Sequence, residues 1–410
     1  MGKIKMKKIK SSVGILLMLG GVSTALAGTY NVAKWGSDSL DCGSRSSPCL
    51  TIQQAIDNSS GNDKIVVFPG TYTENIFINK EGTKLESVGG RYATIIETAD
   101  GTGNTDIIVI FADKVQIGKK GKGFSLVGNA LGFGDGVAAN GDKLKIEDNI
   151  VTALQVGIYL LGEKAQVRNN IVENNNDYGI TCFSCSGSNI ADNLVQNNQY
   201  GIDISGFTNG VSLTNNIVSG NAGSGIYFSN ISHSNKIVAN VAYENGDDGF
   251  YVGETDGSTI TDNIATNNDD DGFDLDQDDD ENKSPIVSSN SAISNGDNGF
   301  DFSDVLTETK FDKNSAIQNA DRGVVVGDAL SVGFSSFKNN NTYASGSGTG
   351  LDLDGVVDTT KPIKHFYGST NGPDSVVDAD ANDAETGAAL IEGTFATKEN
   401  KFASTKAAGL

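Results

Sequence analysis

Short stretches of alternating hydrophobic and polar residues recur along the middle of the chain at a nearly constant spacing. Each repeat has an alternating segment, an Asn, an apolar pair, a polar turn, a Gly and a second alternating segment. The recurring Asn residues are Asn149, Asn170, Asn193, Asn216, Asn240, Asn263, Asn290 and Asn314. The recurring Gly residues are Gly157, Gly179, Gly201, Gly225, Gly249, Gly272, Gly299 and Gly323, with a looser ninth at Gly350. A period of 21 to 27 residues is typical of a solenoid, in which each coil packs only on its neighbours.

The residues within each repeat predict β-strands and no helix. The alternating segments are short and rich in Ile, Val, Phe and Tyr, as strands usually are. Because the frame of leucine-rich repeats is missing, we predict an all-β fold, a single-stranded parallel β-helix whose coils stack about 4.8 Å apart. The recurring Asn is expected to adopt left-handed backbone at an inward bend and to form an amide ladder between coils. The recurring Gly is expected in a turn with positive φ.

The segments on either side of the repeats differ from them in pattern. Residues 51–58, "TIQQAIDN", predict a short amphipathic helix that covers the first coil, with Thr51 and Gln54 as a capping box. The stretch "KIVVFPGTYTENIFI" at 64–78 predicts the first coil, with "PG" as its turn. The repeat frame is lost after residue 355. We therefore divide the chain into an N-terminal cap (28–63), a parallel β-helix (64–355) and a closing segment with a tail (356–410).

The first 27 residues have the pattern of a secretory signal peptide. Five lysines come first, the apolar run "VGILLMLGGV" follows, and "ALA" at 25–27 offers small residues for cleavage. The apolar run is too short to span a bilayer, and no second run is long enough. The sequence therefore predicts a secreted protein without a membrane span, in the extracellular space or the periplasm.

Charge and cysteine content narrow the choice of partner and compartment. The formal net charge of −22 disfavours nucleic acid and anionic lipid as partners. The four cysteines form two close pairs, Cys42 with Cys49 and Cys182 with Cys185, and an oxidising compartment allows both to be disulfides. Three connectivities are possible, of which the local one is the simplest. Three Met, four Cys and two His are few soft ligands for a metal-delivery protein.

Stacking of the repeats in register sorts their residues into columns. Residues one and three positions after the recurring Gly are apolar and are expected to point inward. The residues two positions after the Gly are expected to point outward, and these are Tyr159, Thr181, Asp203, Tyr227, Tyr251, Asp274, Asp301, Val325 and Asp352. The residues just before the Gly are Tyr178, Tyr200, Ser224, Asp248, Asp271, Asn298 and Arg322. One position earlier are Asp177, Gln199, Gly223, Asp247, Asp270, Asp297 and Asp321. One outer face therefore runs from a tyrosine-rich end to an aspartate-rich end.

The aspartate-rich end, around "NNDDDGFDLDQDDD" at 267–280, is a candidate cation site. Carboxylates about 4.8 Å apart on successive coils repel one another, so protonation or a bound cation must relieve the repulsion. Calcium fits best because it takes about six to eight oxygen ligands in flexible geometry. Magnesium, manganese and a merely solvated acidic face are the alternatives. The candidate ligands are Asp247, Asp248, Asp270, Asp271, Asp274 and Asp301.

The tyrosine-rich end is a candidate substrate-binding surface, because exposed aromatic rings can stack on sugar rings. The alternative is that the aromatic columns only stabilise the stacked coils. The candidate residues are Tyr159, Tyr178, Tyr200, Tyr227 and Tyr251. Three carboxylates of the outward column, Asp203, Asp274 and Asp301, are also candidates for the acid and base pair of a glycosidase.

The segment "PCLTIQQAIDNSSGNDKIVVFPGTYTENI" resembles the start of secreted right-handed parallel β-helix proteins, among them pectate lyases, pectin methylesterases and carbohydrate-binding β-helix proteins. The resemblance covers about residues 40–355 and implies a right-handed parallel β-helix without implying one activity. "DDGF" at 247–250 and "DDGFDL" at 270–275 resemble the calcium-dependent pectate lyases of family 9. That resemblance implies Asp248, Asp270, Asp271 and Asp274 as calcium ligands. The family carries its catalytic lysine one coil further on, where this chain has Asp301.

These observations predict a secreted, monomeric β-helix protein that binds or processes an extracellular acidic polysaccharide, such as a polyuronate, along one face with calcium. The first alternative is a calcium-dependent pectate or polyuronate lyase, which Asp301 argues against and for which Arg322 is a weak catalytic candidate. The second alternative is a non-catalytic surface protein or an adhesin-like structural protein.

Overall fold

The computed structural model describes most of the chain between residues 27 and 353 and short strands beyond. The described residues are 27–99, 105–129, 133–228, 234–253, 257–275, 285–302, 309–326, 334–338, 340–343, 346, 349–353, 363–364, 367–368, 375–378 and 391–392. The predicted signal peptide lies outside them except for Ala27, and so do Asp278, Asp279 and Asp280 of the acidic stretch. The division of the chain into cap, β-helix and closing segment stays a prediction.

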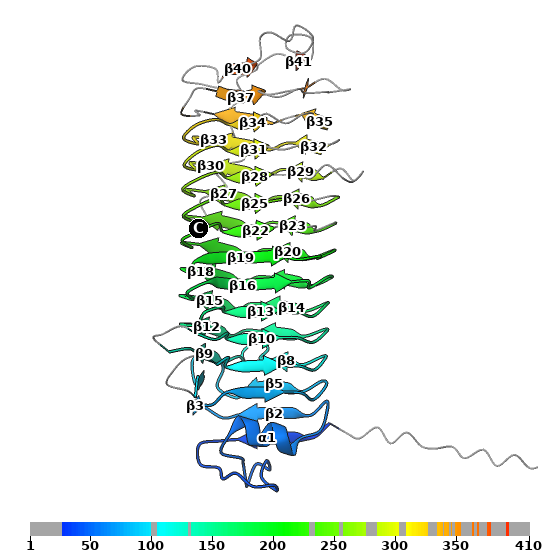
Figure 1. Cartoon of the computed structure of the whole chain (residues 1–410), viewed down its shortest axis with the longest axis vertical. Helices are drawn as coiled ribbons and strands as arrows, with labels where there is room; N and C mark the ends of the chain where they lie inside the picture. Colours follow the sequence, from blue (N-terminus) through cyan, green and yellow to red (C-terminus); the bar gives the residue numbers. More distant parts are fainter. Residues whose placement is uncertain are drawn as a thin grey trace, which may run out of the picture.

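Within the described residues the chain forms a β-helix in which each coil contributes strands to three parallel sheets (Figure 1). Sheet I has 15 strands, and sheets II and III have 13 each. β1 (Thr29–Val32) pairs with β2 (Lys64–Val67), and from β2 on each strand pairs with the strand of the next coil, as β2 does with β5 (Lys84–Ser87) and β3 (Gly70–Thr73) with β6 (Thr94–Glu97). The predicted fold class is therefore confirmed.

The bounds of the strands follow the repeat frame. Sheet I contains β1 (Thr29–Val32), β2 (Lys64–Val67), β5 (Lys84–Ser87), β8 (Gln116–Ile117), β11 (Lys145–Glu147), β14 (Gln166–Arg168), β17 (Asn189–Ala191), β20 (Ser212–Thr214), β23 (Lys236–Val238), β26 (Thr259–Thr261), β29 (Ile286–Ser288), β32 (Thr309–Asp312), β35 (Phe334–Lys338), β38 (Ile363–Lys364) and β41 (Ile391–Glu392). Sheet II contains β4 (Ile76–Ile78), β7 (Ile108–Ile110), β10 (Val137–Ala139), β13 (Ile158–Leu160), β16 (Tyr178–Phe183), β19 (Tyr200–Ser205), β22 (Ile226–Phe228), β25 (Phe250–Val252), β28 (Phe273–Leu275), β31 (Phe300–Phe302), β34 (Val324–Val326), β37 (Thr349–Leu353) and β40 (Ser375–Asp378). Sheet III contains β3 (Gly70–Thr73), β6 (Thr94–Glu97), β9 (Ser125–Val127), β12 (Ile150–Thr152), β15 (Ile171–Glu173), β18 (Leu194–Gln196), β21 (Ile217–Ser219), β24 (Val241–Tyr243), β27 (Ile264–Thr266), β30 (Ser291–Ile293), β33 (Ser315–Ile317), β36 (Asn341–Tyr343) and β39 (Tyr367–Gly368).

The helix α1 (Ile52–Asn58) lies at the N-terminal end of the stack, where the sequence predicts it (Figure 1). Its buried face covers the first coil, which would otherwise expose apolar side chains. The Thr51 side chain accepts a hydrogen bond from the Gln54 backbone N–H, as in a capping box. The reciprocal half of the box is absent, because Gln54 donates to Asn58 and the Thr51 N–H donates to Asp38.

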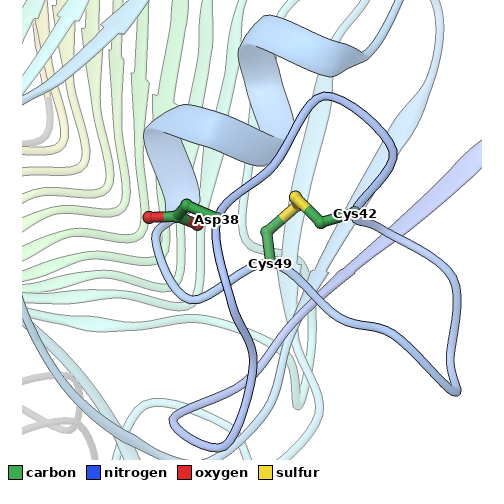
Figure 2. Close-up of side chains that lie close together, drawn as sticks. All are labelled: Asp38, Cys42 and Cys49. Atoms are coloured by element: carbon green, nitrogen blue, oxygen red, sulfur yellow. A yellow bond between two sulfur atoms is a disulfide. The ribbon is translucent and has the colours of Figure 1, made fainter.

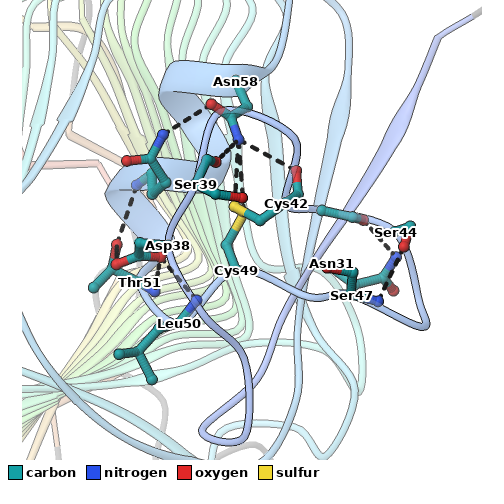
Figure 3. Close-up of a disulfide and its surroundings, with 12 residues drawn as sticks. Asn31, Asp38, Ser39, Cys42, Ser44, Ser47, Cys49, Leu50, Thr51 and Asn58 are labelled. Carbon is teal, nitrogen blue, oxygen red and sulfur yellow. Dashed lines mark hydrogen bonds between the residues drawn. A yellow bond between two sulfur atoms is a disulfide. The ribbon is translucent and has the colours of Figure 1, made fainter.

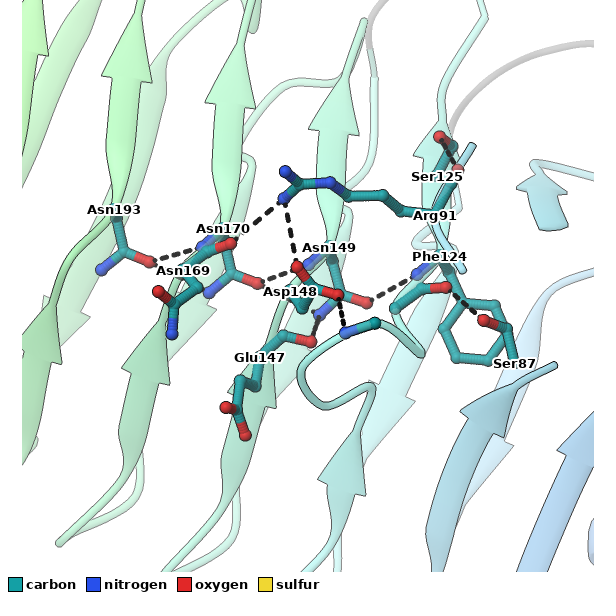
Figure 4. Close-up of polar contacts among 12 residues, drawn as sticks. Ser87, Arg91, Phe124, Ser125, Glu147, Asp148, Asn149, Asn169, Asn170 and Asn193 are labelled. Carbon is teal, nitrogen blue, oxygen red and sulfur yellow. Dashed lines mark hydrogen bonds and ion pairs between the residues drawn. The ribbon is translucent and has the colours of Figure 1, made fainter. Parts of the chain in front are cut away.

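Two columns of buried asparagines connect successive coils. The predicted column, Asn149 to Asn314, continues to Asn340, and each amide donates to the side-chain oxygen of the next Asn. Figure 4 shows its first members, Asn149, Asn170 and Asn193. A second column, which the sequence pattern does not predict, stands five residues later in the repeats from Asn170 on. It consists of Asn175, Asn198, Asn221, Asn245, Asn268, Asn295 and Asn319. Because all of these amides are buried, the hydrogen bonds between coils satisfy groups that water cannot reach.

The structure corrects two expectations about backbone conformation. The residue before each ladder Asn has positive φ, as at Asn169 with φ 55°, while the ladder Asn itself does not. The recurring Gly residues also lack positive φ. A Cβ on Gly157 would lie 2.5 Å from the carbonyl oxygen of Gly179 on the next coil. This Gly is therefore required by the close approach of two coils and not by a turn.

The core of the β-helix consists of apolar side chains stacked from coil to coil. The residues one and three positions after the recurring Gly are buried, as predicted. Phe273 stacks on Phe250 and Phe300 with ring centroids 4.6 and 4.8 Å away, which are the distances that coil spacing imposes. The polar residue between each inward pair is thereby held on the outside of sheet II.

The four cysteines form the two local disulfides, Cys42–Cys49 and Cys182–Cys185. The first joins the two sides of the loop that precedes α1 (Figure 3). The Asn58 side chain at the end of α1 donates to the Cys42 carbonyl at 3.2 Å and so ties this loop to the helix.

Candidate functional site

The candidate site occupies the outer side of sheet II, where residues of successive coils pair in the predicted register. Strand pairing aligns Tyr159, Thr181, Asp203, Tyr227, Tyr251, Asp274, Asp301 and Val325 in one column. The turns before these strands carry further tyrosines and aspartates. The face therefore runs from tyrosines on β13, β16 and β19 to aspartates around β25, β28 and β31.

Five aspartates in the turns before β25, β28 and β31 converge, and we call them the acidic cluster: Asp247, Asp248, Asp270, Asp271 and Asp297. One group of three carboxylates consists of Asp247, Asp248 and Asp270, and each offers an oxygen within 4.8 Å of the others. A second group consists of Asp270, Asp271 and Asp297, with the same separation. Because Asp270 belongs to both groups, the cluster is continuous across three coils.

The pKa values of the acidic cluster show how unfavourable its negative charge is. Burial, together with the charge of Asp301, raises the pKa of Asp271 to about 9. Burial and Asp247 raise the pKa of Asp270. Burial and Asp321 raise the pKa of Asp297, while Arg322 opposes this shift. A cation or a proton would relieve the repulsion.

Two members of the cluster also support the backbone. The Asp248 carboxylate accepts a hydrogen bond from the Asp271 N–H at 3.2 Å, and Asp271 accepts one from the Asn298 N–H at 2.7 Å. The same contact recurs between Asp106 and the Asp135 N–H at 2.8 Å. These bonds use one oxygen of each carboxylate and fix its orientation in the turn.

The predicted ligands Asp274 and Asp301 lie next to the acidic cluster but outside both groups of three. They pair in register on β28 and β31. Asp301 accepts a hydrogen bond from the Asn298 side chain at 3.2 Å, and its charge contributes to the raised pKa of Asp271. Asp297, which the sequence analysis placed in a column but not among the ligands, belongs to the second group instead.

Arg322, the weak catalytic candidate, lies one coil beyond Asp297. Its guanidinium is 3.6 Å from the Asp321 carboxylate. A guanidinium stays protonated in proteins, so Arg322 can supply positive charge but is unsuited to accept a proton.

A third group of possible metal ligands, Asp38 with Cys42 and Cys49, belongs to the N-terminal cap (Figure 2). The two cysteines form a disulfide, which removes their thiolates. Asp38 accepts hydrogen bonds from the Leu50 N–H, the Thr51 N–H and the Thr51 hydroxyl, at 2.8, 3.0 and 3.0 Å. This group is therefore structural.

The tyrosines form two stacks on the outer face. Tyr178 and Tyr200 stack with ring centroids 5.1 Å apart, and Tyr227 and Tyr251 stack at 4.7 Å. Tyr159 pairs in register with Thr181 and belongs to neither of these stacks. All five rings are partly exposed, so they are accessible to a ligand while they also stabilise neighbouring coils.

Carboxylates with raised pKa also occur at the tyrosine-rich end. Burial and the charge of Asp177 raise the pKa of Asp203 to about 6, against a hydrogen bond from Ser205. Burial and Asp106 raise the pKa of Asp135 to about 7. Asp135 is not among the candidates predicted from the sequence, although it precedes Gly136 as Asp271 precedes Gly272.

Comparisons with known proteins agree with this architecture. A family model described as periplasmic copper-binding protein (NosD) matches residues 56–242, and a model of the right-handed β-helix region matches residues 208–355. No curated protein matches the sequence. None of the helices in the described part of the chain is long and apolar enough to cross a membrane.

Three solved structures are similar in fold. The Agl-KA catalytic domain has a TM-score of 0.61 and 13% identity, over 77% of this chain and 64% of that one. The A-module of a mannuronan C-5 epimerase from Azotobacter vinelandii has a TM-score of 0.52 and 16% identity, over 80% of this chain and 93% of that one. The catalytic unit of an α-1,3-glucanase from Streptomyces thermodiastaticus has a TM-score of 0.54 and 12% identity, over 86% of this chain and 71% of that one.

At these identities the similarity shows the fold alone, and the chain spans 64% of the length of the Agl-KA domain. The strand order and the two family models nevertheless agree with one another. The chain is a right-handed β-helix repeat protein.

Proposed function

We propose that this protein acts outside the cytoplasm and binds an acidic polysaccharide along the outer side of sheet II, with calcium held by the acidic cluster. The observation that carries the proposal is the presence of two groups of three carboxylates that share Asp270 on the same face as the stacked tyrosines. A bound cation would join the negative protein to a negative polymer, which the net charge of −22 would otherwise repel.

Calcium suits the acidic cluster because the cluster consists of hard carboxylate oxygens. Calcium accepts such oxygens in irregular geometry and leaves positions for ligands from a bound molecule. The raised pKa values of Asp270, Asp271 and Asp297 support a cation, since the cluster is costly to ionise without one.

Copper, which the NosD description names, suits the described residues less well. Copper sites use thiolate, thioether and imidazole ligands. The three methionines are Met1, Met6 and Met18, all within the predicted signal peptide. All four cysteines are in disulfides, and the two histidines, His233 and His365, lie outside the described residues.

Three observations support a polysaccharide as the partner and an exported protein. Stacked, partly exposed tyrosines offer flat apolar surfaces for sugar rings. The similar structures include an enzyme named for mannuronan and one named for α-1,3-glucan. The two disulfides and the periplasmic description of the NosD family both favour an oxidising compartment.

Binding is favoured over cleavage at the acidic cluster. A lyase needs a base beside the cation-bound uronate. Asp301 stands where family 9 pectate lyases have their lysine. It accepts a hydrogen bond from Asn298, and after burial its charge is the next cause of the raised pKa of Asp271. A carboxylate there adds negative charge beside a negative substrate.

The test is retention of the protein on immobilised polygalacturonate and alginate, in calcium and in EDTA. We expect retention in calcium that EDTA abolishes. Asp270→Asn should weaken retention at least tenfold, because Asp270 belongs to both carboxylate groups. Asp192→Asn, an exposed change in another turn, is the matched control and should bind like the wild type.

Equal retention in calcium and EDTA, or an unchanged Asp270→Asn variant, would exclude the proposed cation site. Absence of retention on both polymers would exclude polyuronate binding. Release of an unsaturated product that absorbs in the ultraviolet would show that the protein is a lyase instead.

A further inference from the structure

Strands β16 and β19 are longer than their neighbours in sheet II. Each has six residues, whereas β13 and β22 on either side have three. Their pairing extends from Tyr178 opposite Tyr200 to Phe183 opposite Ser205. A strand of six residues spans about 16 Å between its end residues. The two strands therefore form a broader platform than the rest of the face.

The centre of this platform is polar although it is almost fully shielded from water. Thr181 and Asp203 pair in register, and each is 6% exposed. One oxygen of Asp203 accepts a hydrogen bond from the Ser205 hydroxyl at 2.9 Å. The Thr181 hydroxyl has no hydrogen-bond partner, although Thr181 stands in the outward column. A buried polar group without a partner is costly to the protein, so an external partner would relieve that cost.

Aromatic side chains lie at both ends of the platform. At one end Tyr178 and Tyr200 stack with an interplanar angle of 24°. At the other end Phe183, held between Cys182 and Ser184 in the short disulfide loop, is 45% exposed. Phe207, just after β19, is 71% exposed. Binding of a ligand over an exposed aromatic ring is favourable, because it removes apolar surface from water.

We propose that β16 and β19 form a subsite for an uncharged sugar ring, with Thr181 and Asp203 bonded to its hydroxyls and the aromatic residues against its apolar faces. The subsite rests on the proposed function, because it lies on the same face as the acidic cluster. It deepens that function by assigning an uncharged sugar to the end of the face away from the cation.

The charges around the subsite favour an uncharged ring. Burial, and then the charges of Asp203 and Asp177, raise the pKa of the Tyr178 hydroxyl, which marks this end of the platform as negative. A sugar carboxylate there would meet repulsion, whereas a hydroxyl can donate to Asp203. Because the centre is shielded, entry of a ring requires the partly exposed side chains beside it in the same column, Tyr159 and Tyr227, to move aside.

The experiment measures binding of neutral oligosaccharides to the full chain in EDTA, so that it does not depend on the cation. The probes are cello-, laminari-, nigero- and manno-oligosaccharides of about four to six units, a span that covers a platform of about 16 Å. We expect at least one of them to bind in EDTA. Thr181→Val should weaken that binding about fivefold, the effect of one lost hydrogen bond. Tyr200→Ala should weaken it at least tenfold.

Thr214→Val, the same substitution in sheet I, is the matched control and should bind like the wild type. Absence of binding to all four neutral series, or equal affinities of Thr181→Val and wild type, would overturn the subsite. EDTA is present in every measurement and the probes are uncharged, which separates this test from that of the cation site. Failure of the calcium-dependent retention alone would leave the subsite result intact.

Discussion

Asp135 shows at the scale of one residue how burial couples this fold to pH. Burial, and then the charge of Asp106, raise its pKa to about 7, with a further contribution from Asp177 and an opposing hydrogen bond from the Val156 backbone. In an unfolded chain an Asp titrates near pH 3.9, roughly. Between these pH values the folded protein holds a proton that the unfolded chain has lost. Stability should therefore fall as the pH rises from about 4 to about 7 and then level off.

Thermal melting across this pH range checks the prediction. The contribution of Asp135 is on the order of 4 kcal/mol, so Asp135→Asn should remove part of the decline in melting temperature. Asp192→Asn, at an exposed position, should show the same decline in melting temperature as the wild type. An identical pH profile for Asp135→Asn and the wild type would contradict the prediction.

The sequence predicts which residues share a column, but not the pKa or the hydrogen bonding of each side chain. The repeat frame assigns Asp248 and Asp271 to the correct column, because paired strands align residues that are equally far from the recurring Gly. The raised pKa of Asp271 depends on burial and on Asp301 from the next coil, and neither appears in a local pattern. The unpaired hydroxyl of Thr181 likewise depends on side-chain packing.

At the scale of an element, the asparagine columns are expected to contribute strongly to stability. The side-chain oxygen of Asn216 accepts hydrogen bonds from the backbone N–H and from the side-chain amide of Asn193, at 3.0 Å each. Asn216→Leu would leave these buried donors without partners, at a cost of about 1–3 kcal/mol for each group. We expect urea unfolding to show a loss of at least about 2 kcal/mol.

Asn209→Ala, in an exposed loop, is the matched control and should unfold near the wild-type midpoint. A midpoint for Asn216→Leu within the error of the wild-type value would show that the column is dispensable.

The sequence predicts one asparagine column and not the other, although both are equally regular. Asn170 stands between two strands, so it is easily assigned to a bend, whereas Asn175 follows in a polar stretch that resembles an ordinary turn. The conformations of the bends are also not evident from residue type. Ala239 and Glu244 have positive φ, a conformation that their side chains do not favour. Stacking of the coils imposes it.

At the scale of the whole molecule, the period of the sequence is sufficient to predict the fold. Each coil has the same residue types at the Gly, Asn and inward positions, so many weak sequence patterns predict the same fold. The site is less predictable because it depends on the residues that vary between coils. Tyr227, Asp274 and Asp301 occupy equivalent positions, and their chemistry changes along the stack.

A stack in which each coil contacts only its neighbours should respond locally to a core defect. Phe273 is fully buried between Phe250 and Phe300. Phe273→Ala should cost about 3–5 kcal/mol through lost burial and a residual cavity. Hydrogen exchange should then lose protection at the amides of β25, β28 and β31, while those of β10 and β13 keep theirs.

Phe183→Ala is the matched control, because its ring is exposed and its removal creates no core cavity. It should leave protection unchanged throughout the β-helix. Uniform loss of protection in Phe273→Ala would mean that the stack unfolds as one cooperative unit. Local loss would instead mean that the coils bearing the acidic cluster can open while the tyrosine-rich end stays folded, so that cation binding and sugar binding respond separately to a defect.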